Sequence, residues 1–389
     1  MRIQSIDIFP LAIAFRLTFR HALASRDAMS SLIVRVRDEQ GRAGYGECAP
    51  RSYVSGEDAD SAHRTIEQRL SPPWRGAEFA AFDDVIAALR DAQGRVKRDE
   101  HAAFCAMELA ILDLAGRTFG RSAADMLGPV TLPGIQYSGV VSADSPERTR
   151  EFCEAYRKMR LPAVKMKVGS SLDNDLANLS VAREILGDAC SLRVDANGAW
   201  SADEALQRIE QMQRFRIEAV EQPVAADDIA GLTHVTAASN VPIIVDESLI
   251  SFADAMSLIE ARACHMFNIR VSKNGGLIGA ARLRETALQH GLDWMLGAQV
   301  GESAILSAAG RHLATRGAPP RWCEGSFGTL LLERDIAREN LTFGPGGAAP
   351  AIEGPGLGIT IDNSALEPQP RGQDPKPEPS TTGGSPWAR

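Results

Sequence analysis

The chain has 389 residues, 44% of them apolar and 24% charged, which is ordinary usage for a soluble protein with a sizeable core. The 42 basic and 50 acidic residues give a net charge of −8, and no apolar run reaches the roughly 18 residues of a spanning helix, so nucleic-acid and membrane surfaces are not expected. Six scattered cysteines without a C-x-x-C pair indicate neither a disulfide framework nor a zinc knuckle, and we expect a cytoplasmic protein that acts on a small molecule.

Residues 1–125 are expected to form an α+β domain. Alternation of apolar and polar residues predicts strands near the N-terminus, and DEQGRAGYG at 38–46 supplies the turn of a hairpin. Apolar residues three and four apart then predict helices over 61–70, 82–92 and 101–120.

Residues 126–345 alternate short β-rich runs with polar turns and amphipathic helices, which is typical of parallel βα units. The runs are IQYSGVVSA, AVKMKVG, SLRVDANGAW, IEAVEQPV, VPIIVDES, MFNIRVSKNGG, LDWMLGAQVGE and RWCEGSFG. Eight runs favour a closed barrel over an open sheet. We expect residues 346–365 to return to the first domain. Residues 366–389 are rich in Pro, Gly and charge, and we expect them to form a disordered tail.

An ionisable residue lies near the end of each of five consecutive middle runs. These residues are Lys167, Asp195, Glu221, Asp246 and Lys273, at intervals of 28, 26, 25 and 27. In a barrel of this type the carboxyl ends of the strands meet on one face, where active sites lie. Each motif taken alone would be an ordinary turn or an exposed strand, so it is the shared spacing that indicates a common site.

Three converging carboxylates repel one another unless a cation lies between them. Oxygen ligands without His or Cys favour a hard ion, so we predict that Asp195, Glu221 and Asp246 bind Mg²⁺, with Mn²⁺ as a possible substitute. Lys165 and Lys167 are two apart on a predicted strand and therefore point to the same side. Neighbouring positive charge lowers the pKa of a lysine, so one of them is a candidate general base, and Lys273 is a candidate on the opposite side.

These segments resemble the enolase superfamily, and within it the muconate lactonizing enzyme subgroup, over essentially the whole chain up to the tail. The resemblance implies an α/β fold, a modified TIM-type (β/α)7β barrel with an N-terminal α+β capping domain, and a homo-oligomer. By similarity, AVKMKVG implies that Lys167 is a catalytic acid/base, with Lys165 beside it. VDANGAW, VEQP and VDES imply the metal ligands, and SKNGG implies that Lys273 is the opposing acid/base.

The resemblance also indicates where substrate contacts are expected. Two cap loops, residues 16–26 and 48–58, would close the site. GAQVGES on the seventh strand resembles an M-L-E-S/T segment. WCEGS on the eighth offers one acid where related dipeptide epimerases carry D-x-D for the substrate's ammonium. The candidate substrate-binding residues are His21, Arg26, Arg51, Tyr53, Asn197, Glu302, Glu324 and Ser326.

Sites of this superfamily use a Lys or His base with Mg²⁺ to remove the proton α to a carboxylate, which leaves an ene-diolate. We expect an isomerase that racemises or epimerises an acyl amino acid or a related carboxylate. β-Elimination or cycloisomerisation of the o-succinylbenzoate synthase or muconate cycloisomerase type remains an alternative, which would make the enzyme a lyase or a cycloisomerase. A non-catalytic binding or scaffold protein on the same fold is a third reading.

Overall fold

The computed structural model describes residues 1–21, 24–142 and 145–366. The side chains of residues 17–26 lie outside this description, as do residues 367–389, on which most of the predicted tail falls. No helix in the described ranges is both long and apolar enough to cross a membrane.

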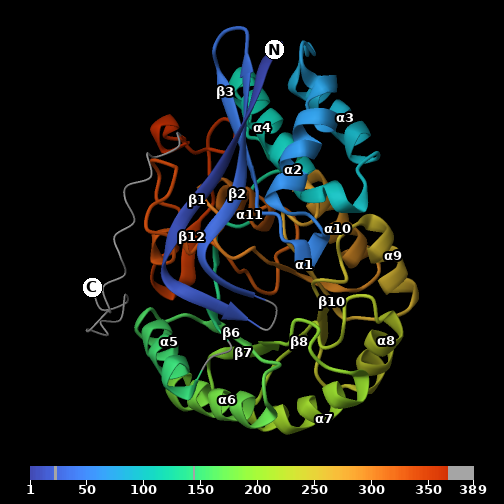
Figure 1. The fold of residues 1–389 in the computed structure, drawn as a ribbon, viewed down its shortest axis with the longest axis vertical. Helices are drawn as coiled ribbons and strands as arrows, with labels where there is room; N and C mark the ends of the chain where they lie inside the picture. The colour runs from blue at the N-terminus through green and yellow to red at the C-terminus, as the bar shows by residue number, and fades with distance from the viewer. Residues whose placement is uncertain (22–23, 143–144, 367–389) are drawn as a thin grey trace.

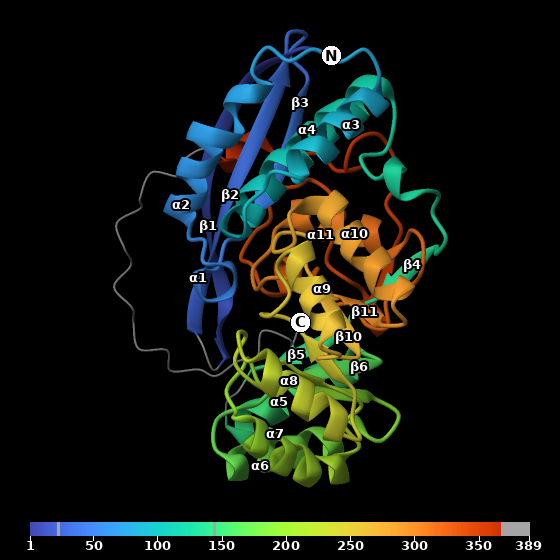
Figure 2. The ribbon, with the colours of Figure 1, turned by 90° about the vertical axis from the view of Figure 1, so that its right-hand side faces the viewer.

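The N-terminal part is an antiparallel sheet covered by helices (Figures 1 and 2). Its strands are β1 (Ile3–His21), β2 (Ala24–Asp38) and β3 (Ala43–Cys48), in the order β1-β2-β3. Its helices are α1 (Ser52–Ser55), α2 (Ala59–Thr65), α3 (Phe82–Gln93) and α4 (His101–Phe119). Helix α4 is the centre of this layer, since it is buried from His101 to Gly116, and it ends at Gly120 in the left-handed conformation.

The second part is a curled parallel sheet of seven strands in the order β11-β10-β9-β8-β7-β6-β5. The strands are β5 (Gly139–Val141), β6 (Ala163–Lys167), β7 (Ser191–Asp195), β8 (Val220–Glu221), β9 (Ile243–Val245), β10 (Met266–Ile269) and β11 (Asp293–Leu296). The helices that follow them are α5 (Pro146–Lys158), α6 (Leu172–Leu186), α7 (Ala202–Met212), α8 (Ile229–Ala238), α9 (Phe252–Glu260), α10 (Gly276–Gln289) and α11 (Ala304–Ala314). Helices α5 to α9 run round the outside of the sheet in Figure 1.

The eighth predicted run closes the sheet without forming a strand of its own. Cys323 forms parallel bridges to Leu296 on one edge and to Tyr137, next to the other edge. Glu324 N donates to Leu296 O (2.8 Å), and Ser138 N donates to Cys323 O (2.8 Å). The chain then leaves the extended conformation at Gly325 (φ 113°) and Ser326 (φ 50°), which ends the pairing. The expected fold class, a barrel with an N-terminal α+β cap, is confirmed.

The first predicted run divides into two parts. Its start belongs to β4 (Gly134–Gln136), which pairs antiparallel with β12 (Ala348–Pro350), and only residues from β5 onward join the curled sheet. Farther on, Leu357 N donates to the Asp113 carboxylate of α4 (2.8 Å), so the C-terminal described residues contact the N-terminal layer. The predicted domain boundaries themselves stay a prediction.

Candidate active site

Strand register brings three of the predicted residues side by side. Lys167 pairs with Asp195 between β6 and β7, and Asp195 pairs with Glu221 between β7 and β8. Asp246 follows directly on β9, the next strand in the sheet. All three carboxylates are fully buried, so the sheet presents them as a row at its carboxyl end.

Lysines neutralise one end of this row. Lys165 Nζ lies 3.0 Å from Glu221 Oε2, 3.1 Å from Asp195 Oδ2 and 2.8 Å from Glu324 Oε2. Lys167 Nζ donates to Asp195 Oδ2 (2.5 Å) and to Asn197 Oδ1 (2.9 Å). The two lysines therefore point to the same side of β6, as their spacing predicts.

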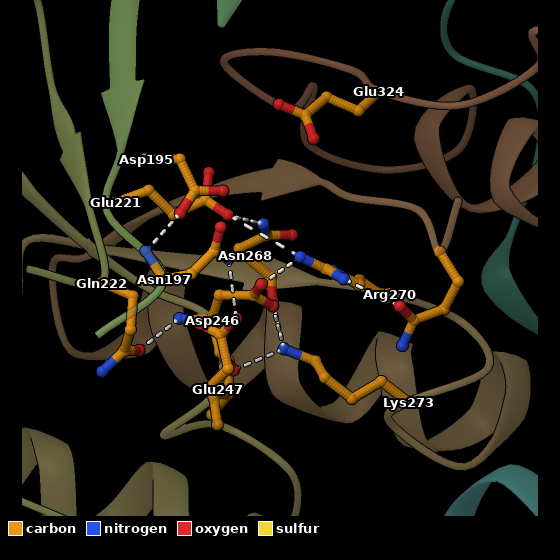
Figure 3. A network of polar contacts seen from close by, with 12 residues as sticks. Asp195, Asn197, Glu221, Gln222, Asp246, Glu247, Asn268, Arg270, Lys273 and Glu324 are labelled. Carbon is orange, nitrogen blue, oxygen red and sulfur yellow. Dashed lines mark hydrogen bonds and ion pairs between the residues drawn. The ribbon is translucent and has the colours of Figure 1, made fainter. Parts of the chain in front are cut away.

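Another lysine and an arginine occupy the other end (Figure 3). Lys273 Nζ donates to Asp246 Oδ1 (2.8 Å) and Asp246 O (2.7 Å), and to Asn268 O (3.0 Å). The Arg270 guanidinium donates to Asp246 Oδ2 and lies 3.8 Å from Glu221 Oε1. Asp246 thus shares its two carboxylate oxygens between two cations.

The charges of the row depend on these partners. Burial raises the pKa of the Asp195 carboxyl, but Lys167 and Lys165 outweigh it and hold that pKa well below its usual range. For Asp246, burial likewise opposes ionisation, and Arg270 and Lys273 lower its pKa nonetheless. Burial, followed by the charge of Asp195, raises the pKa of Glu221 to about 8. Glu221 is therefore protonated more readily than the two aspartates, which their cationic partners hold in the ionised form.

A cavity opens above the row, and its lining is partly polar and partly apolar. Polar side chains that line it include Lys165, Lys167 and Arg270. A layer of apolar and aromatic residues also lines it, formed by Tyr53, Val54, Phe152, Val300, Phe327 and Leu330–Leu332. Lys273 and the three carboxylates of the row are not among the lining residues, because they lie behind that layer and Lys273 is only 1% exposed.

The candidate substrate-binding residues separate into three groups. The cavity is lined by Tyr53, Asn197, Glu302, Glu324 and Ser326. Arg51 does not line it; its buried guanidinium donates to Ser30 O, Pro50 O and Val300 O and so joins the cap loop to the segment after β11. The side chains of His21 and Arg26 lie outside the described residues.

Four polar residues of the site were not predicted. Arg193 donates to Glu324 Oε1 (2.5 Å), and Asn268 donates to Glu221 Oε1 (2.8 Å). Arg270 holds Asp246, as described above, and Glu247 accepts from Asn197 (2.9 Å) while its Oε2 has no partner. The sequence could have indicated two of them. Arg193 stands two residues from Asp195, and Arg270 stands two residues from Asn268, so strand alternation points each arginine to the same inward side as its polar neighbour.

The donor set of the row fits a hard divalent cation. In the arrangement described here no three His, Cys, Asp or Glu side chains of residues 1–21, 24–142 and 145–366 lie together as a metal-binding group, because lysine and arginine nitrogens lie between the carboxylates. Asp195, Glu221 and Asp246 nonetheless lie at the ends of three neighbouring strands, β7, β8 and β9. Carboxylate oxygens are the ligands that Mg²⁺ prefers.

Comparison with known proteins is consistent with this geometry. The family described as enolase C-terminal domain-like matches residues 148–365. The L-Ala-D/L-Glu epimerase of Bacillus subtilis is 31% identical over 363 residues, which cover 92% of this chain and 97% of the epimerase.

Two solved structures extend the comparison. A dipeptide epimerase from Enterococcus faecalis, complexed with Mg and the dipeptide L-Leu-L-Tyr, matches with a TM-score of 0.84 at 27% identity and covers 92% of this chain and 100% of its own. A muconate lactonizing enzyme from Pseudomonas fluorescens, complexed with muconolactone, matches with a TM-score of 0.86 at 25% identity and covers 94% and 98%. These relatives thus include isomerases with small carboxylate ligands.

Proposed function

This chain belongs to the enolase superfamily, in its muconate lactonizing enzyme subgroup, and from that premise we propose that it is a Mg²⁺-dependent isomerase. It would remove the proton α to a substrate carboxylate and return a proton to the opposite face of the same carbon. The products would be the racemate or epimer of an acyl amino acid or a related carboxylate.

The observation that carries the proposal is a lysine at each end of a buried row of carboxylates. Lys167 pairs with Asp195 at the β7 end, and Lys273 pairs with Asp246 beyond β9. Removal of an α-proton from one face and its return on the other needs a base on each side of the substrate carbon. Lysines at opposite ends of the row support this arrangement, although Lys273 lies behind the residues that line the cavity.

The carboxylates and the lysines would have different roles in the reaction. Asp195, Glu221 and Asp246 would hold the Mg²⁺, which when bound supplies positive charge opposite the charge that develops on the substrate carboxylate. Lys167 would exchange the α-proton on the side open to the cavity, and Lys273 on the other. Lys165 would hold Asp195, Glu221 and Glu324 in place, because its ammonium is shared among all three.

The surroundings of Glu324 favour an acylated nitrogen over a free ammonium group. Its carboxylate already lies 2.8 Å from Lys165 Nζ and 2.5 Å from Arg193 Nη2. A substrate ammonium would have to compete with two buried cations for this one acid. An amide nitrogen carries no charge to neutralise, and the apolar residues that line the cavity suit an apolar acyl or side-chain group.

The alternative within the same chemistry is β-elimination or cycloisomerisation. The likeness to the muconate lactonizing enzyme favours it, and so does the position of Lys273 behind the lining of the cavity, where its charge could act without proton transfer. A non-catalytic scaffold is the remaining alternative, and the test below distinguishes racemisation from elimination and from inactivity towards the compounds used.

Proton NMR in D₂O with Mg²⁺ tests the proposal. The protein would be incubated with N-succinyl amino acids, free dipeptides and succinyl-cyclohexadiene carboxylates while the α-proton signal is followed. We expect that signal to disappear from N-succinyl amino acids while the rest of the spectrum stays. New olefinic or aromatic signals would instead establish elimination, and no change with any compound would contradict an enzymatic role on these carboxylates.

Single substitutions test the two lysines on the substrate so identified. General acid–base groups contribute about 10²–10⁴-fold to rate, so Lys167→Ala and Lys273→Ala should each lower kcat by that amount with the fold retained. Circular dichroism checks the fold, and Lys158→Ala on the exposed end of α5 serves as the control. Full racemisation by either site variant would refute the two-base assignment.

A further inference from the structure

The two lysines are held by different parts of the protein. After Lys167, Val168 N donates to Asp195 O (2.9 Å) and Gly169 N donates to Asp175 Oδ2 (3.0 Å), and both acceptors belong to the barrel. The segment around Lys273 receives contacts from the N-terminal layer on both sides. This difference has no counterpart in the sequence pattern, which treats the two lysines alike.

Three residues of the N-terminal layer hold the Lys273 segment, and we call them the cap clamp: Ala49, Gln93 and Glu108. Ala49 N donates to Ser272 Oγ (3.0 Å), immediately before Lys273. With its amide oriented to suit its neighbours, Gln93 donates to Gly275 O (3.0 Å) and to Glu108 Oε2 (3.3 Å). The clamp therefore contacts the chain on either side of the lysine.

Glu108 makes the innermost contact. It lies on α4, is fully buried, and accepts from Ile278 N (3.2 Å) in the first turn of α10. Unpaired N–H groups at the start of a helix need such acceptors. A Cβ built on Gly276 would lie 2.3 Å from Glu108 Oε1, so the carboxyl touches the backbone where α10 begins. Helices α4 and α10 lie against each other in Figures 1 and 2.

We infer that the cap clamp, chiefly Glu108, positions Lys273 relative to the row of carboxylates and so sets the rate of proton exchange on one face of the substrate. Lys273 stands between the clamped residues Ser272 and Gly275, and its side chain reaches Asp246 and Asn268 from that short segment. A shift of its backbone would move its Nζ directly. Lys167 would not move, because the clamp does not contact its segment.

The inference rests on the function proposed above and gives Glu108 a positioning role. In a two-base site each stereoisomer loses its α-proton to a different lysine, and lysine protons exchange with D₂O. Loosening Lys273 should therefore slow α-proton exchange from one stereoisomer more than from the other. A defect that only destabilises the fold would slow both equally.

The test compares exchange rates in D₂O for the L and D forms of one N-succinyl amino acid that wild type racemises. We expect Glu108→Ala to change the ratio of the two rates about tenfold, in the same direction as Lys273→Arg. Glu108→Gln keeps an oxygen acceptor for Ile278 N, so it should restore the wild-type ratio. Gln93→Ala gives a second, milder variant if Glu108→Ala does not fold.

Asp113→Ala is the matched control. Asp113 is also a buried carboxyl on α4 that accepts from backbone N–H groups, at Tyr45 N (3.0 Å) and Leu357 N (2.8 Å), but neither partner belongs to the Lys273 segment. Its loss should lower stability and leave the ratio unchanged. An unchanged ratio in Glu108→Ala and Gln93→Ala would overturn the inference while the proposed function stands. If wild type exchanged the α-proton of no N-succinyl amino acid in the first place, that result would contradict the proposed function and the inference together.

Discussion

At the scale of single residues, the carboxylate row is the feature on which the chemistry depends. Its members are buried, and each is in contact with lysine or arginine nitrogens. Like charges at this spacing are tolerated only with compensating cations. The lysine and arginine side chains therefore have to do two things. They must stabilise the buried carboxylates, and they must leave carboxylate oxygens accessible to a metal ion.

The ligand assignment predicts a loss of metal affinity on neutralising one carboxylate. Asp195→Asn removes a negative charge and one anionic oxygen, so Mg²⁺ binding should weaken at least about tenfold. Titration calorimetry measures the affinity, and the Mg²⁺-dependent rise in Tm reports it independently. Glu210→Gln on the exposed side of α7 is the control. Unaltered Mg²⁺ affinity in Asp195→Asn would remove this residue from the ligand set.

The row could be predicted because strand spacing alone determines it. One βα unit separates each pair of ionisable residues, and the register of β6, β7 and β8 then places Lys167, Asp195 and Glu221 in line. The depth of Lys273 behind the cavity lining could not be predicted. It depends on which side chains line the cavity in three dimensions, and from this run Arg270 lines it whereas Lys273 does not.

At the scale of elements, the close packing of β3 against α4 explains why β3 contains two glycines. The backbones of β3 and α4 pack directly against each other: a Cβ built on Gly46 would lie 2.0 Å from Ala106 O, and one on Gly44 would lie 2.2 Å from Leu114 N. Only residues without a side chain permit this approach. The sequence pattern predicted the hairpin from its turn and alternation, but close packing of a strand on a helix has no periodic signal.

Gly46→Ala should therefore force β3 away from α4. The atoms in the way belong to the backbone of α4, which cannot rotate aside, so we expect a loss of about 1–3 kcal/mol and a fall in Tm of several degrees. Differential scanning calorimetry measures it. Gly94→Ala is the matched control, because that glycine has φ −63° and its added Cβ would lie 3.4 Å from the nearest atom. Equal Tm values for the two variants would argue against the close packing.

At the scale of the whole molecule, buried carboxyls of the cap hold the starts of barrel helices. Glu47 on β3 accepts from Ser303 N (3.1 Å) and Leu306 N (3.2 Å) at the start of α11, and Glu108 accepts from Ile278 N at the start of α10. Burial raises the pKa of both carboxyls. The junction of cap and barrel therefore has a dependence on pH that neither part would have in isolation.

Glu108 allows the sign of that dependence to be worked out. Burial raises its pKa from 4.5 to about 8, so between these values the folded protein keeps a proton that the unfolded chain releases. The free energy of unfolding should then fall as pH rises from about 4.5 to about 8, by on the order of 5 kcal/mol in total from this group. Glu108→Gln cannot lose a proton, so its Tm should exceed that of wild type by an amount that grows across this range and is constant above it. Scanning calorimetry of both proteins at saturating Mg²⁺ between pH 5 and pH 8.5 measures this difference in Tm. A Tm difference that does not change with pH would show that Glu108 ionises normally in the folded protein.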